Sequence, residues 1–272
     1  MSDRRLRRVG HKGADAIVPG NTIESFCAAA EAGADTIELD VLRPRSDFSA
    51  AGDWRAAAPG PVAVGPDGDR PEPLLCAHDW GDAAWRRPHT LEEALDAFTE
   101  PPLDRLEIDC DLKVAGREDE VVAALRERGL VDRAMTSTME LGSVRALRAL
   151  APDLRVGWTY PRVTRSWDRK WWARPAVLAA GARMRRRLPG LASRRLPQLG
   201  VSAMWVYHPL VSAALARACR SAGVELIAWT VDDLERMRSL LDLGVDGICT
   251  NDPRLFAALA RSPGPSGSAV LP

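Results

Sequence analysis

Short apolar runs alternate along this chain with longer stretches in which apolar residues recur at helical spacing. We predict strands at the apolar runs, which cover residues 8–11, 36–41, 105–112, 133–137, 154–158, 203–206, 225–230 and 246–250. Eight strand–helix units in about 250 residues are typical of a TIM (β/α)8 barrel. An open, doubly wound sheet is the alternative, but it rarely needs eight such units in one domain. The pattern therefore predicts an α/β fold of the barrel type.

The ends of two helices can also be predicted. Asn21 is a candidate N-cap of the first helix, with Glu24 three residues later as in a capping box. The helix after residues 225–230 is expected to begin at Asp232 and to end at Gly244.

Two segments interrupt the repeat and are predicted to be insertions after strands 2 and 5. Residues 43–73 are rich in Pro and Gly, which predicts a loop that ends in a small hairpin near residues 74–77. Residues 161–199 are predicted to be a basic, helical insertion. In a barrel both would leave strand ends where active sites form. We expect one domain over residues 1–261 and a disordered tail over residues 262–272.

Composition excludes several classes of protein. With 46% hydrophobic and 27% charged residues, the 272-residue chain can bury a core and is not expected to be disordered. No apolar run reaches the ~20 residues of a membrane span, and no signal peptide is visible at the start. Five cysteines stand singly in apolar segments, which indicates buried thiols rather than disulfides or a zinc site. We expect a soluble, cytoplasmic protein.

Charge is unevenly distributed although the 37 basic and 37 acidic residues balance. Residues 162–195 hold eleven basic side chains, with Asp168 as the one acid. The segment also has a narrow apolar stripe, formed by Val177, Gly181, Met184 and Leu188. We favour a helix whose stripe packs on the barrel, and peripheral contact with anionic lipid is the alternative. No nucleic-acid-binding module accompanies the basic residues, so we expect no nucleic-acid partner.

Ionisable side chains gather at the predicted carboxyl ends of the first three strands. They are His11 on the first strand, Glu38 and Asp40 on the second, and Asp109, Asp111 and Lys113 on the third. Residues i and i+2 of a strand point to the same side, so each group shares one face. A second imidazole, His78, follows residues 74–77. Each side chain alone could be structural, but together they predict an active site with a hard cation bound by oxygen ligands.

Several motifs, in a fixed order, carry a resemblance to a known family. They are His11-Lys12-Gly13, Pro19-Gly20-Asn21-Thr22, residues 33–41, His78-Asp79, Asp111-Leu112-Lys113, residues 228–231 and residues 243–248. The set resembles the glycerophosphodiester phosphodiesterases, TIM barrels related to phosphatidylinositol-specific phospholipases C. The motifs bracket nearly the whole chain, and the ordered set is far more specific than any one of them.

The resemblance implies roles for individual residues. It implies an acid–base pair, His11 and His78; cation ligands, Glu38, Asp40 and Asp111; phosphate contacts, Lys12 and Lys113; and a side chain lining the alcohol side, Trp229. The implied cation is Ca²⁺ or Mg²⁺. The implied reaction is hydrolysis of a glycerophosphodiester to glycerol 3-phosphate and an alcohol.

Three residues depart from the family pattern. Lys12 stands where the family usually has Arg, Gly20 where it has Glu, and Asp111 where it has Glu. Glu107 and Asp109 are candidate substitute carboxylates, and Asp109 has the correct facing. Three alternatives stay open: lysophospholipase D activity on a lysophospholipid, phospholipase C-like cleavage that gives a cyclic phosphate, and a catalytically weak barrel that binds phosphate or lipid headgroups.

Overall fold

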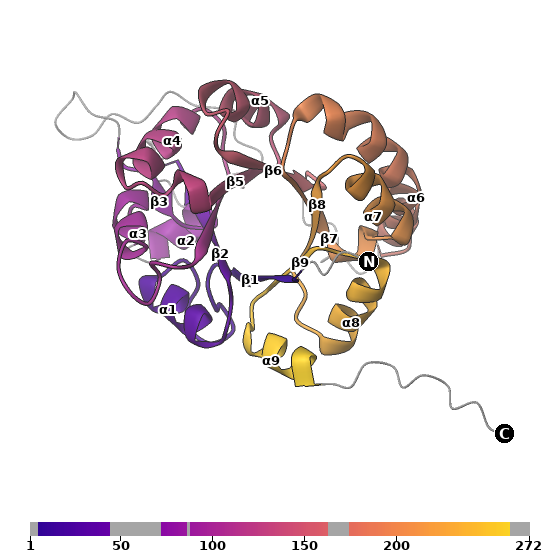
Figure 1. Cartoon of the computed structure of the whole chain (residues 1–272), viewed down its shortest axis with the longest axis horizontal. Coiled ribbons are helices and arrows are strands. Elements are labelled where there is room, and N and C mark those ends of the chain that lie inside the picture. The colour runs from indigo at the N-terminus through magenta and orange to yellow at the C-terminus, as the bar shows by residue number, and fades with distance from the viewer. Residues whose placement is uncertain (1–4, 44–71, 86–87, 163–173, 262–272) are drawn as a thin grey trace.

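The computed structural model, which describes residues 5–43, 72–85, 88–162 and 174–261, has a closed ring of eight parallel strands at its centre (Figure 1). The strands are β1 (Arg7–His11), β2 (Thr36–Leu42), β4 (Glu107–Leu112), β5 (Ala134–Thr138), β6 (Arg155–Tyr160), β7 (Ala203–Tyr207), β8 (Glu225–Trp229) and β9 (Gly247–Thr250). The ring closes because β1 pairs with both β2 and β9. The predicted TIM barrel is confirmed, and the open doubly wound sheet is wrong.

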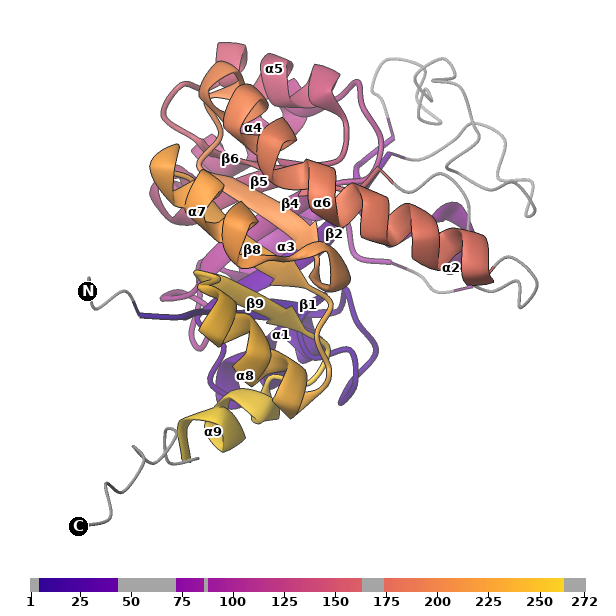
Figure 2. The same cartoon turned by 90° about the vertical axis from the view of Figure 1, so that its right-hand side faces the viewer.

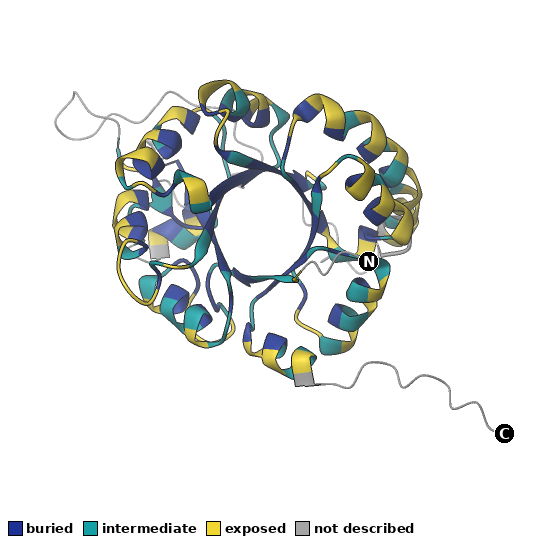
Figure 3. Cartoon of the chain, in the orientation of Figure 1, coloured by how far each residue is buried: buried dark blue, intermediate teal, exposed yellow. Residues whose placement is uncertain are grey.

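Helices surround the strands. They are α1 (Ile23–Glu31), α2 (Trp80–Trp85), α3 (Leu91–Ala97), α4 (Glu118–Glu127), α5 (Leu141–Leu150), α6 (Arg174–Leu199), α7 (Ala213–Ser221), α8 (Leu234–Leu243) and α9 (Arg254–Arg261). They turn buried faces to the barrel and exposed faces outward (Figure 3). Most of the apolar core therefore lies between the helices and the outer face of the sheet.

The N-cap residues of two helices lie one position after the predicted ones. Thr22, not Asn21, caps α1, since its side chain accepts a hydrogen bond from the backbone N–H of Ser25. In the same way Asp233, rather than Asp232, caps α8, which ends at Gly244 as predicted. Both displaced residues make other contacts at the mouth of the barrel, described below.

The inside of the barrel is layered. Ion pairs fill the end from which the strands start: Arg7 contacts Glu107 and Glu225, and Arg155 lies 3.1 Å from Glu107. An apolar layer follows, formed by Val9, Met135, Ala203, Trp205, Ile227 and Cys249. Glu107 thus lies at the opposite end from the predicted site. The expectation that it substitutes for a missing ligand is wrong, because two arginines neutralise it there.

Both insertions are described in part. Residues 44–71 lie outside the described residues. At the end of this insertion, where a small hairpin was predicted, the two-residue strand β3 (Leu75–Cys76) pairs antiparallel with β2. In the second insertion, residues 163–173 lie outside the described residues, and α6 forms residues 174–199 (Figure 2). The tail predicted from residue 262 also lies outside them.

Two expectations from composition can be compared with the structure. The five cysteines are free, and four of them are buried. Within the described ranges, no helix combines the length and apolar character that a bilayer crossing requires.

Candidate active site

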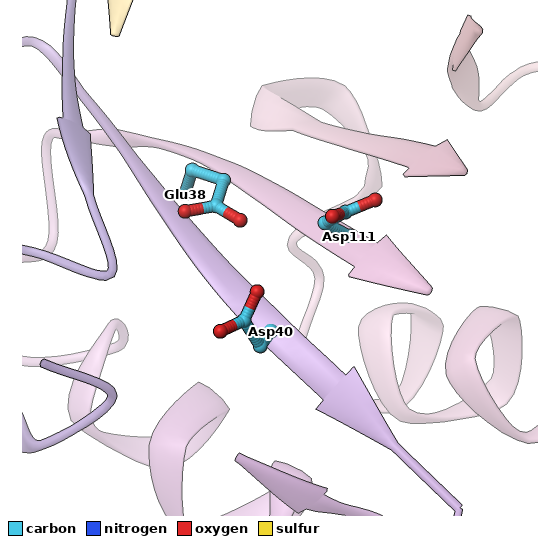
Figure 4. Close-up of side chains that lie close together, drawn as sticks. All are labelled: Glu38, Asp40 and Asp111. Atoms are coloured by element: carbon cyan, nitrogen blue, oxygen red, sulfur yellow. The ribbon is translucent and has the colours of Figure 1, made fainter. Parts of the chain in front are cut away.

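Three buried carboxylates from two neighbouring strands form the centre of the site. Glu38 and Asp40 come from β2 and Asp111 from β4 (Figure 4). The register that pairs Asp40 with Asp111 sets them side by side. One oxygen from each carboxylate lies within 4.8 Å of the others, although the residues are only 4%, 0% and 7% exposed. The structure thus brings together the three predicted cation ligands.

Lys113 partly neutralises this acidic cluster of Glu38, Asp40 and Asp111. Its ammonium group contacts the carboxylates of Asp40 and Asp111. Burial alone would lower the pKa of Lys113, but the charges of the carboxylates raise it well above its usual range. Burial opposes ionisation of Asp40 too, and Lys113 nevertheless holds the pKa of Asp40 well below its usual range. Burial and the nearby charge of Asp40 raise the pKa of Glu38.

The acidic cluster fits a hard divalent cation. Three carboxylates face one ammonium group, so at full ionisation the cluster keeps an excess of negative charge in a buried place. Water cannot solvate that excess, and a cation with two positive charges would balance it. Carboxylate oxygens are also the ligands that Ca²⁺ and Mg²⁺ prefer.

Asp109 lies beside the acidic cluster but is not part of it. It pairs in register with Glu38 and is fully buried. The hydroxyl of Ser137 donates to its Oδ2 at 2.7 Å, while its Oδ1 has no hydrogen-bond partner among the described residues. Burial and the charge of Asp111 raise the pKa of Asp109 well above its usual range. The three carboxylates whose oxygens lie within 4.8 Å of one another do not include Asp109, so it does not join the candidate ligand set.

Asn21 orients Asp40, a contact that sequence reasoning missed. Its side-chain amide donates to Asp40 Oδ2 at 2.7 Å and accepts from the Asp40 backbone N–H at 2.9 Å. The backbone of Asn21 is left-handed, with φ 59°, which turns the side chain away from the cap of α1 and toward β2. Two simultaneous hydrogen bonds fix the carboxylate of Asp40 within the acidic cluster.

The two predicted imidazoles lie near Asp40. His11 ends β1, and its Nδ1 lies 2.6 Å from Asn251 Oδ1. His78 follows β3, and its Nδ1 lies 3.1 Å from Asp79 Oδ2. After Lys113, both imidazoles contribute to the low pKa of Asp40. Removal from bulk water lowers the pKa of His11, and the charge of Lys12 lowers it further.

Asp15 occupies the space that Gly20 leaves. A Cβ atom at Gly20 would come within 2.6 Å of Asp15 Oδ1, and the Gly20 backbone N–H donates to that oxygen at 2.7 Å. Lys12 Nζ lies 2.7 Å from Asp15 Oδ2, and the Lys12 backbone N–H donates to Glu38 Oε2. Two departures from the family pattern, Lys12 and Gly20, are therefore coupled through one carboxylate.

Trp229 ends β8 at the same rim of the barrel. Its ring lies 5.7 Å from that of Tyr207, which ends β7 and is 43% exposed. The Nε1 of Trp229 is buried and has no hydrogen-bond partner among the described residues. These two rings give the site an aromatic side opposite the charged strands β2 and β4.

A TIM barrel that carries buried carboxylates, two imidazoles and two lysines at its strand ends has the features of the barrel phosphodiesterases. The chain belongs to the glycerophosphoryl diester phosphodiesterase family, whose profile matches residues 11–46 and 84–255. The predicted family and its enzyme class, the phosphoric diester hydrolases, are thereby confirmed.

Relatives and solved structures agree with this assignment. The chain is 27% identical over 266 residues to a glycerophosphodiester phosphodiesterase of Caldanaerobacter subterraneus subsp. tengcongensis, covering 94% of this chain and 98% of that one. The fold matches a glycerophosphoryl diester phosphodiesterase structure from Agrobacterium tumefaciens with a TM-score of 0.65 at 19% identity, over 94% and 97% of the two chains. It also matches an Oleispira antarctica phosphodiesterase in complex with the product sn-glycerol-3-phosphate, with a TM-score of 0.60 at 17% identity, over 93% and 96%.

Proposed function

We propose that this chain hydrolyses glycerophosphodiesters to sn-glycerol 3-phosphate and an alcohol, with the help of a divalent cation. The observation that carries the proposal is the acidic cluster with an imidazole on β1 and another after β3. Family membership supports the reaction class, and the product complex of the Oleispira antarctica protein supports this substrate class.

Each group would have a definite part in the reaction. Glu38, Asp40 and Asp111 would hold Ca²⁺ or Mg²⁺, which when bound supplies positive charge next to the phosphodiester. Lys12 and Lys113 would bind phosphate oxygens and stabilise the negative charge of the transition state.

The two imidazoles would move the protons. One of His11 and His78 accepts a proton from water as the new P–O bond forms. The other protonates the alkoxide as the bond from phosphorus to the alcohol breaks. Trp229 and Tyr207 would line the space for the alcohol, since both rings lie at the mouth of the barrel.

Turnover is expected to need a divalent cation. The purified chain would be assayed for glycerol 3-phosphate release from a panel of glycerophosphodiesters and lysophospholipids, with Ca²⁺, with Mg²⁺ and with EDTA. We expect release with at least one cation and loss of nearly all activity in EDTA, because the acidic cluster repels the phosphodiester without it. Full activity in EDTA would contradict the metal dependence.

The same assay separates the alternatives. A cyclic phosphate product would indicate phospholipase C-like attack by a substrate hydroxyl. Release from lysophospholipids but not from water-soluble diesters would indicate a lysophospholipase D. No release by folded protein, together with metal-dependent binding of glycerol 3-phosphate in calorimetry, would indicate a binding protein.

The later part of α6 packs on the barrel. Of the predicted apolar stripe, Leu188 is buried in the core and Met184 packs against it, and Ala192 and Leu196 continue the buried face. This supports packing of the stripe on the barrel. Leu178, nearer the start of α6, is 72% exposed. Peripheral membrane contact therefore stays a prediction for the exposed side chains of α6, and cytoplasmic location stays a prediction too.

A vesicle experiment tests the membrane contact. If α6 docks on anionic lipid, the chain should co-sediment with phosphatidylserine-containing vesicles and not with pure phosphatidylcholine vesicles. Reversing two exposed charges of α6, Arg186→Glu with Arg187→Glu, should then weaken binding by about tenfold or more, since each basic residue contributes about 1 kcal/mol. Equal sedimentation with both kinds of vesicle, or none with either, would count against the contact.

A further inference from the structure

A chain of hydrogen bonds connects His11 to the far end of the sequence. His11 Nδ1 lies 2.6 Å from Asn251 Oδ1, and the Asn251 side-chain amide donates to Asp232 Oδ2 at 2.7 Å. Asn251 directly follows β9, and Asp232 lies between β8 and α8. His11 is on β1, so the contacts exist only because the barrel closes between β1 and β9.

Asp232 determines which way the Asn251 amide points. Its Oδ1 accepts from the backbone N–H of Asn251 at 2.8 Å and from the hydroxyl of Thr250 at 2.9 Å. A carboxylate has acceptor oxygens and no donor, so the group of Asn251 that faces Asp232 Oδ2 must be the NH₂. The carbonyl oxygen of the amide must therefore face His11.

The orientation of the amide determines the tautomer of His11. An amide oxygen can only accept, so Nδ1 of His11 must carry the proton in their 2.6 Å hydrogen bond. A neutral imidazole has one N–H, which leaves Nε2 with a free lone pair. Nε2 is then the atom that exchanges protons with a ligand.

We infer that Asn251 and Asp232 are positioning residues that hold His11 with Nδ1 protonated and Nε2 unprotonated, available to accept a proton. The catalytic importance of this tautomer rests on the proposed function, because it matters to turnover only if His11 takes part in proton transfer. The tautomer itself does not depend on turnover. Structure and activity can thus be tested separately.

Imidazole nitrogen spectra test the tautomer directly. The chain has four histidines, and a His11→Gln variant identifies which signals belong to His11. Long-range ¹H–¹⁵N spectra would be recorded at about pH 9, above the ordinary histidine pKa of ~6.5, with Mg²⁺ and again with EDTA. We expect the Nδ1–H pattern for His11 in the unaltered protein under both conditions.

Two single variants should weaken the preference of His11 for the Nδ1–H tautomer. Asn251→Leu removes the acceptor, so His11 should shift toward the Nε2–H tautomer. Asp232→Asn lets the Asn251 amide turn over, so both tautomers should be populated. If the proposed function holds, each change should also lower kcat by about 10- to 100-fold with a much smaller change in KM, as loss of a supporting hydrogen bond typically does.

The double variant D232N/N251D exchanges the amide and the carboxylate. The amide at position 232 can then donate to the carboxylate at position 251, which still accepts from Nδ1 of His11, so the Nδ1–H tautomer should return. An Nε2–H pattern in the unaltered protein would overturn the inference, as would an unchanged pattern in both single variants. If the tautomer changes as expected but the unaltered protein releases no glycerol 3-phosphate, the proposed function fails and the positioning role stands.

Discussion

Replacing His11 by alanine is expected to lower kcat for glycerol 3-phosphate release by about 10²- to 10⁴-fold, the usual contribution of a general acid or base. Alanine leaves no group at the end of β1 that can carry a proton, and the side-chain oxygen of Asn251 loses its hydrogen bond to His11. KM should change much less, because Lys12 and the acidic cluster remain to bind substrate. Steady-state kinetics on the best substrate of the panel measure both constants.

His89→Ala is the matched control. It makes the same substitution just before α3, where the imidazole lies 3.9 Å from a carboxylate oxygen of Glu93 and takes no part in the proposed reaction. We expect wild-type kcat from His89→Ala. Thermal unfolding of both variants checks that the loss in His11→Ala is chemical and not a loss of fold. Wild-type kcat from folded His11→Ala would refute the proposed role of this residue.

Most of the barrel was predictable from the sequence because its strands are buried on both faces. Such strands appear as short apolar runs, as for residues 36–41 in β2 and residues 203–206 in β7. Helix starts were less predictable, because adjacent polar residues compete for the cap. Asn21 and Thr22 can both cap a helix, and only the contact with Asp40 determines that Asn21 is used elsewhere.

The candidate site was predictable where its residues are neighbours along a strand. Alternation along β2 puts Glu38 and Asp40 on one face, and the register with β4 adds Asp111 to it. Asn251 and Asp232 were not predictable. The contact of Asn251 with His11 spans 240 residues and depends on how the ring closes, and Asp232 acts through Asn251. Asp15 was missed for a related reason, since its role depends on the space above Gly20.

Replacing Lys113 by methionine is expected to destabilise the chain strongly when no divalent cation is present. The ammonium group is buried between Asp40 and Asp111, and methionine removes the charge while keeping much of the volume. Removing one partner of a buried ion pair typically costs about 3–5 kcal/mol. For a chain of this size that lowers the Tm by about 6–20 °C, which thermal unfolding in EDTA measures.

The loss of Tm in Lys113→Met should depend on pH in a defined direction. Lys113 raises the stability of the folded chain at pH values below its unfolded pKa of 10.5, and this contribution is lost as the pH rises through its higher folded pKa. Asp40 contributes above its unfolded pKa of 3.8 and loses its contribution as the pH falls through its lower folded pKa. The Tm difference between Lys113→Met and the unaltered chain should therefore be largest between about pH 5 and 9. It should shrink in acid, because the carboxylates that have lost Lys113 can be protonated there.

A divalent cation should restore part of the stability that Lys113→Met loses. The cation binds the folded acidic cluster and not the unfolded chain, so saturating Ca²⁺ or Mg²⁺ should raise the Tm of the variant more than that of the unaltered chain. Arg126→Met is the control, because it removes an exposed cation whose ion pair with Asp153 is expected to contribute less than about 1 kcal/mol. An unchanged Tm in Lys113→Met, or equal effects of the cation on both chains, would show that Lys113 and the cation do not neutralise the same carboxylates.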